Sequence, residues 1–299
     1  MLIDSARALV AEIGAEVWPG WSGAPFELLL VGGDREVLFG RERLPAGFEP
    51  LLAGGMGVRA PVFPVQMLAT MPVFGLPATI VVGVPEATER AVTEWMLVLL
   101  HEHFHQWQMR GRDYFEATAA LGLAPAGDAT GRWMLEYPFP YAEPAVAGAF
   151  DQLSGELAAL LRRPASEDIA VDSDEFWRRY RRWLATLEAS DARYLEFQLW
   201  QEGVARFVEL RLAEAASARW RVPLALAADG GFEDFGVAAC AVWEQLFEQL
   251  ESPDLAAQQR VAFYAFGAGL ALLLDRTDAG WKSRYEAPRF SLGPAPAFD

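Results

Sequence analysis

The sequence predicts an α+β fold that is mainly helical, with a small β-containing N-terminal part, then a long helix and a helical C-terminal part. Short runs rich in Val, Ile and Leu lie before residue 85 and are bounded by turn residues. From there on, apolar residues recur with helical spacing. This pattern predicts two subdomains, 1–86 and 87–299, or one continuous domain.

The N-terminal part begins with an amphipathic pattern over residues 1–20, without the basic start and apolar block of a signal peptide. FELLLV (26–31) and EVLFG (36–40) flank Gly-Gly-Asp, a turn that predicts a hairpin. ATIVVGV (78–84) is rich in β-branched residues and predicts a third strand.

A long helix is predicted to begin at Pro85, because proline suits the first turn of a helix, and to continue to Met109. Prolines and glycines crowd residues 121–145, which predicts a long loop. Beyond the loop, the spacing of apolar residues predicts five helices, at 146–162, 173–190, 192–218, 235–251 and 254–275.

The composition limits the classes of partner. A net charge of −16 in 299 residues disfavours nucleic acid and anionic membranes as partners. The longest apolar run, at 261–274, is too short to span a bilayer. A single cysteine, Cys240, excludes an internal disulfide framework and indicates a reducing compartment, so we expect a cytoplasmic protein.

The chain has three histidines, and all lie in LVLLHEHFHQWQMRG, residues 97–111. His101, Glu102 and His105 form the HExxH pattern. Residues four apart share a face of a helix, so both imidazoles can bind one ion. Glu102 is rotated by about 100°, within reach of a bound water, whereas His103 is rotated by about 200° and cannot join the site.

The alternative to a metal site is that the two histidines are ordinary hydrogen-bonded residues on a packed helix. The preceding segment, TEWMLVLL, is apolar, so unpaired polar groups there would be costly, and this favours a metal site. Gln108 continues the same face and can hold the second nitrogen of a ligand, or it is an ordinary half-buried amide. A catalytic zinc needs a third protein ligand, and with no histidine left that ligand must be a carboxylate.

The best candidate carboxylate is Glu202, in the predicted helix FQLWQEGVARFVELRLAE (197–214). Apolar residues flank it, and Gly203 permits another backbone to approach closely. Arg206 and Glu209 share its face. Glu202 therefore either binds the metal, with Arg206 and Glu209 as supporting polar groups, or pairs with Arg206.

The two patterns together, HExxH and a downstream Glu-Gly-x-Ala-Arg helix, resemble the gluzincin branch of the zincin metallopeptidases. The resemblance implies a zincin-like fold, one Zn²⁺ per chain with Glu202 as third ligand, and a peptide or protein substrate. It also implies that the strand at 78–84 is the edge strand that holds an extended substrate. The metzincin branch is excluded, because Gln108 and Gly111 stand where it has glycine and histidine.

Similar enzymes stabilise the oxyanion with a tyrosine or histidine from the C-terminal helical part. Tyr264 is the candidate here, because a phenol inside an apolar helix needs a partner. Tyr137 and Tyr141, in the long loop, are its rivals.

The leading hypothesis is a zinc-dependent hydrolase, most specifically a metallopeptidase with Glu102 as general base. A di-iron carboxylate protein would need a second ExxH motif, for which no histidine remains. The remaining alternative is a helical protein that zinc only stabilises, or a degenerate peptidase that acts as a binding module. The intact Glu102 argues against it, because a structural site has no use for a base.

Overall fold

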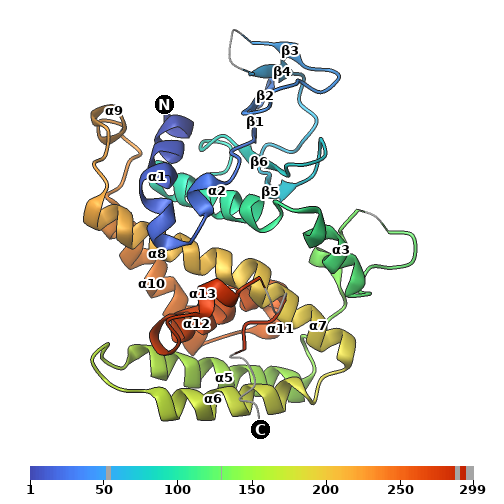
Figure 1. Ribbon diagram of the computed structural model, residues 1–299, viewed down its shortest axis with the longest axis vertical. Coiled ribbons are helices and arrows are strands. Elements are labelled where there is room, and N and C mark those ends of the chain that lie inside the picture. The colour runs from blue at the N-terminus through green and yellow to red at the C-terminus, as the bar shows by residue number, and fades with distance from the viewer. Residues whose placement is uncertain (52–54, 129, 287–289, 294–299) are drawn as a thin grey trace. The chain divides into compact units, whose positions relative to one another are not determined.

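A computed structural model describes residues 1–51, 55–128, 130–286 and 290–293 (Figure 1). Contacts divide the chain into two compact units. The first contains residues 1–114 and 208–240, and the second contains residues 115–207 and 241–299. The boundary predicted at 86/87 lies inside the first unit, so the histidine helix groups with the sheet that precedes it.

The first unit contains a mixed sheet of six strands in the order β3-β4-β2-β1-β6-β5. β1 and β2 form the predicted antiparallel hairpin, β6 runs parallel to β1, and β5 runs antiparallel to β6. The strands are β1 Leu28–Val31, β2 Glu36–Phe39, β3 Glu49–Pro50, β4 Gly57–Arg59, β5 Leu68–Met71 and β6 Thr79–Gly83. A small N-terminal sheet followed by a mainly helical part confirms the predicted fold class.

The predicted edge position of the strand at 78–84 is wrong. β6 pairs with β1 on one side and with β5 on the other, and all five of its residues are buried. The edge strand next to it is β5, whose residues are half-buried. No strand was predicted there, because Leu-Ala-Thr-Met has little β-branched character and its pairing with β6 decides its conformation.

The histidine helix is α2, Val92–Gln108, which packs against β5, β6 and the N-terminal helix α1, Leu2–Val17 (Figure 1). It begins seven residues later than predicted. Residues 85–89 form a turn that ends at Glu89 with φ of 55°, a conformation that cannot continue a helix.

A buried amide joins α2 to the sheet. The Nε2 of Gln106 donates a hydrogen bond of 3.0 Å to the carbonyl oxygen of Glu27, and the backbone N–H of Glu27 donates to Oε1 of Gln106 at 3.3 Å. Gln106 is fully buried, so this reciprocal pair fixes the position of the helix along the strands.

The remaining structure is mainly helical, and the predictions for 146–162 and 235–251 are confirmed within two residues. The helix predicted at 173–190 ends six residues earlier, at Leu184, and the one predicted at 192–218 is divided by a π-helical stretch. The helices are α3 Arg112–Ala120, α4 Trp133–Glu136, α5 Pro144–Arg162, α6 Ala170–Leu184, α7 Ala189–Gln198, α8 Val204–Arg219, α9 Leu224–Ala227, α10 Phe235–Glu251, α11 Leu255–Gln258, α12 Ala262–Thr277 and α13 Trp281–Arg284. The predicted helix at 254–275 is interrupted at Gln259, and the predicted loop contains α4. Within the described part of the chain, we find no helix with the length and apolar character needed to cross a membrane.

Between α7 and α8 the helix widens into one π-helical stretch, η2, at Leu199–Gly203. Gly203 lies against Gly267 of α12 so closely that a Cβ atom on either glycine would overlap the backbone of the other. The close approach predicted for Gly203 is therefore confirmed. Single π-helical turns inside α-helices are frequent at functional sites.

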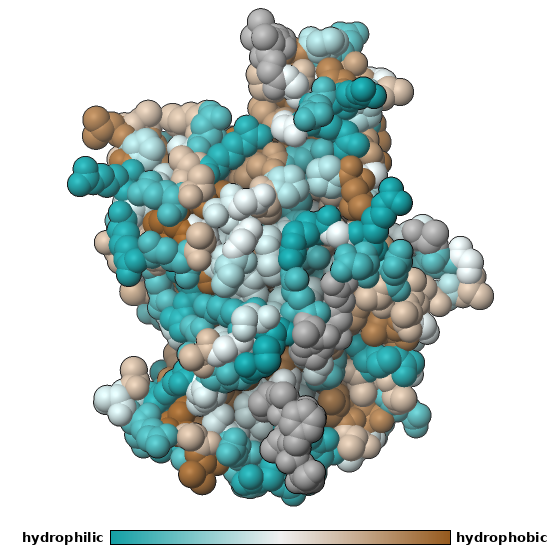
Figure 2. Space-filling model, in the orientation of Figure 1, coloured by the Kyte–Doolittle hydropathy of each residue, from teal (hydrophilic) through white to brown (hydrophobic). Residues whose placement is uncertain are grey.

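Hydrophilic side chains predominate on the face shown in Figure 2, and apolar residues there are scattered. This surface agrees with the acidic composition and with the burial of the large aromatic side chains.

We expect Gly203→Ala to destabilise the protein by about 1–3 kcal/mol or more, because the added methyl group must displace the backbone of Gly267. Gly148→Ala is the matched control: Gly148 lies inside α5 with open space around its Cβ position, so the change should be neutral or stabilise by about 0.5–1 kcal/mol. Urea unfolding measures both changes, and equal effects of the two variants would contradict the packing argument.

Candidate metal centre

Three residues of α2 form a buried group that can hold a metal ion. His101, Glu102 and His105 are 8 %, 7 % and 4 % exposed, and one potential ligand atom from each lies within 4.8 Å of the others. The helix places both imidazoles on one face, as the spacing predicts. Among the described residues, this is the group of histidine, cysteine and carboxylate side chains arranged closely enough to bind an ion.

The two imidazole rings point their Nε2 atoms at each other, 3.1 Å apart. Each Nδ1 atom faces an oxygen instead. The Nδ1 of His105 lies 2.6 Å from Oε1 of Gln108, and the Nδ1 of His101 lies 3.3 Å from Oε2 of Glu209, which is also buried. Because an amide oxygen only accepts, the contact with Gln108 places the proton of the His105 ring on Nδ1 and leaves its Nε2 as an acceptor.

A metal ion that binds both Nε2 atoms would replace the direct contact of 3.1 Å between them. A tetrahedral zinc ion that binds two imidazole nitrogens at about 2.0–2.1 Å would hold them about 3.3 Å apart. The observed separation is close to that value. The contacts on the Nδ1 side are also those that typically orient histidine ligands of metals. The residues present therefore fit a zinc ion.

Glu102 is held by a residue that the sequence analysis missed. The hydroxyl of Thr70 lies 2.9 Å from Oε2 of Glu102 and 2.8 Å from its backbone oxygen, so its one proton is shared between these two acceptors. Thr70 belongs to the edge strand β5. No sequence spacing connects residues 32 apart on different elements, so only the packing of α2 on β5 reveals the contact.

His103 is not part of this group. Its Nε2 donates a hydrogen bond of 3.0 Å to the carbonyl oxygen of Pro25, and its ring stacks on Phe26 at 4.6 Å between centroids. Burial lowers the pKa of His103 to about 4, so the ring is neutral at physiological pH. Its role is to join the helix to the segment before β1.

Glu202 lies half-buried in the π-helical stretch η2 of the second unit. Arg260 donates a hydrogen bond of 2.5 Å to the phenol oxygen of Tyr264. Burial and then the charge of Glu202 raise the pKa of Tyr264 well above its ordinary value, so Tyr264 remains a protonated donor.

The structure shows contacts of the other predicted residues. Arg206 donates a hydrogen bond to the side chain of Gln245 in the second unit, whereas Glu209 belongs to the first unit beside His101. The hydroxyl of Tyr137 donates to Asp191 at 2.7 Å, and that of Tyr141 lies 3.4 Å from the hydroxyl of Tyr194.

Comparison of the chain with models of protein families, with curated proteins and with solved structures gave no match. The interpretation of the site therefore rests on its geometry.

We expect the protein to bind one zinc ion per chain, and His101→Ala or His105→Ala to remove most of it, because either change leaves a single imidazole. His103→Gln is the control, because glutamine can still donate to Pro25 and both Nε2 atoms remain. Elemental analysis after dialysis measures the stoichiometry. Full zinc content in either alanine variant, or its loss in His103→Gln, would contradict the assignment.

Proposed function

We propose that the protein is a zinc-dependent hydrolase, and specifically a metallopeptidase that acts on a peptide or protein in the cytoplasm. The observation that carries the proposal is the meeting of the two Nε2 atoms beside a buried carboxylate. Two imidazoles alone are found in many kinds of metal site. Hydrolysis also requires a general base, and a neighbouring glutamate that another residue orients can supply it.

His101 and His105 would hold the zinc ion, which when bound polarises the scissile carbonyl and acidifies water. Glu102 accepts the proton of the attacking water and passes it to the leaving amine. The hydroxyl of Thr70 occupies Oε2 of Glu102, which leaves Oε1 for the proton. Gln108 fixes the tautomer of His105, and Glu209 lies beside Nδ1 of His101, where it would favour a proton on that nitrogen.

We propose Glu202 as the third ligand. Two observations favour it over Glu209. An oxygen of Glu209 lies 3.3 Å from Nδ1 of His101, on the side of the ring away from Nε2. Glu202 lies in a π-helical turn, a departure from regular helix of the kind that accompanies functional sites. Tyr264, as a protonated phenol, suits the role of oxyanion donor.

The competing function is a helical protein that zinc only stabilises, or a binding module derived from a peptidase. Such a site would use closed coordination by protein ligands and would not need an oriented base. The hydrogen bond between Thr70 and Glu102 favours catalysis over this alternative.

Two glutamate variants test the function. Glu102→Gln should keep zinc and lower turnover on a peptide library by about 10²–10⁴-fold, because an amide cannot accept the proton. Glu202→Gln should lose zinc, whereas Glu94→Gln, on an exposed turn of the same helix as Glu102, should behave as wild type. An active Glu102→Gln would refute the mechanism, and full zinc in Glu202→Gln would refute the third ligand.

Thr70→Val should lower kcat by about tenfold with KM and zinc content unchanged, since the variant keeps the shape of the side chain but frees the carboxylate of Glu102. Thr70→Ser should restore kcat, because serine also has a hydroxyl group. Thr88→Val is the control, since that hydroxyl bonds only the local backbone carbonyls of Val84 and Pro85. Wild-type kcat in Thr70→Val would show that Thr70 does not position the base.

A further inference from the structure

We propose that Arg260 and the polar side chains around it in the second unit bind the C-terminal carboxylate of a peptide. The inference rests on the proposed function and names its substrate class, peptides with a free C-terminus. Four observations support it: the partners of Arg260, the backbone beside it, an unused acceptor nearby, and the charge of the cluster.

Arg260 is half-buried and uses little of its hydrogen-bonding capacity. Its Nη1 donates to the phenol oxygen of Tyr264 at 2.5 Å, and its guanidinium lies 5.7 Å from the centre of that ring. A guanidinium has five N–H donors in a planar fork that matches the two oxygens of a carboxylate. Among the described residues, no carboxylate forms an ion pair with Arg260, in contrast to Arg162 and Arg163 on the surface.

The backbone next to Arg260 is strained. Gln259 has φ of 49° and ψ of −130°, a conformation that favours glycine and costs about 1–3 kcal/mol in other residues. It interrupts the continuous helix that the sequence predicts and leaves Arg260 in the single turn η3, Gln259–Val261. Strain of this kind persists only where surrounding contacts require it, and it concentrates at binding sites.

An unused acceptor lies in the same cluster. The Nε2 of Gln198 and the hydroxyl of Tyr194 both donate to the carbonyl oxygen of Met134, at 2.5 and 3.1 Å. The Oε1 of Gln198 is then buried without a hydrogen-bond partner among the described residues. The charges of Arg260 and Glu202 both act on the phenol of Tyr194, which places these groups in one neighbourhood.

The combination of groups matches a peptide C-terminus. Its carboxylate fits the fork of Arg260, and the preceding amide N–H can donate to Gln198.

The charge of the cluster favours a single carboxylate over phosphate. One guanidinium balances one negative charge, and a phosphate dianion would meet both Glu202 and a strongly acidic protein.

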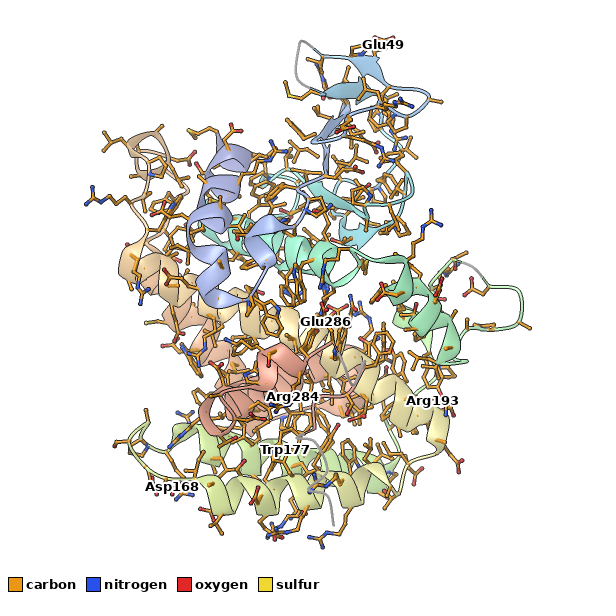
Figure 3. The ribbon with its side chains drawn as sticks, in the orientation of Figure 1. Glu49, Asp168, Trp177, Arg193, Arg284 and Glu286 are labelled. Atoms are coloured by element: carbon orange, nitrogen blue, oxygen red, sulfur yellow. The ribbon has the colours of Figure 1, made fainter. Side chains whose placement is uncertain are left out.

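The test measures binding of benzoylglycine and its primary amide to the full-length zinc-loaded protein by ligand-observed NMR. We expect the acid to bind at least about tenfold more tightly than the amide, and Arg260→Gln to abolish this difference. Arg260→Lys should keep part of it, because the charge remains and the fork is lost. Arg193→Gln, at an exposed arginine labelled in Figure 3, is the control and should behave as wild type.

Three outcomes would overturn the inference: no preference for the acid, a preference that survives in Arg260→Gln, or an equal loss in Arg193→Gln. Competition by inorganic phosphate as strong as that by benzoylglycine would also overturn it, because it would show a general anion site. Thermal unfolding of Arg260→Lys checks that the fold is intact.

A second arm separates this inference from the proposed function. Peptides with free and amidated C-termini are compared as substrates of the wild type and of Arg260→Gln. Cleavage of both with equal KM in both proteins would overturn the inference and leave the peptidase standing. An Arg260-dependent preference in binding without any cleavage would support the carboxylate site and refute the peptidase.

Discussion

The site depends on the meeting of two imidazole nitrogens. His101 and His105 turn their Nε2 atoms to within 3.1 Å of each other. Gln108 contacts Nδ1 of His105 at 2.6 Å, and Glu209 lies 3.3 Å from Nδ1 of His101. Rotation of the His105 ring would leave a buried polar group unpaired, which is costly in an apolar region. The apolar first half of α2 contributes by keeping water away from the site.

The edge of the sheet contributes to the site by orienting its residues. β5 brings Thr70 to Glu102, and Gln106 fixes how far α2 lies along the strands. The contacts of Gln106 with Glu27 are reciprocal and buried, and they fix the helix on which Glu102 lies. The part-buried contact of Thr70 then restricts the orientation of the carboxylate of Glu102.

The second unit departs from regular helix at two places, and both adjoin the residues of the polar cluster. The π-helical turn presents Glu202, and the strained Gln259 presents Arg260. A regular α-helix through either segment would satisfy local propensity better. The tight packing of Gly203 on Gly267 explains how the first departure is maintained. Departures of the backbone from the conformation that the local sequence favours are expected at binding sites.

The sequence by itself determined the features that depend on neighbours a few residues apart. These are the β1–β2 hairpin, the long helices, and the shared face of His101 and His105, because turn chemistry and helical period are local properties. The tertiary structure decided the rest. Thr70 reaches Glu102 only through packing, β5 is a strand only because β6 pairs with it, and α2 starts late because Glu89 turns the chain. Contacts between distant segments leave no periodic trace in the sequence, since the energy that selects them comes from burial and hydrogen bonding across elements.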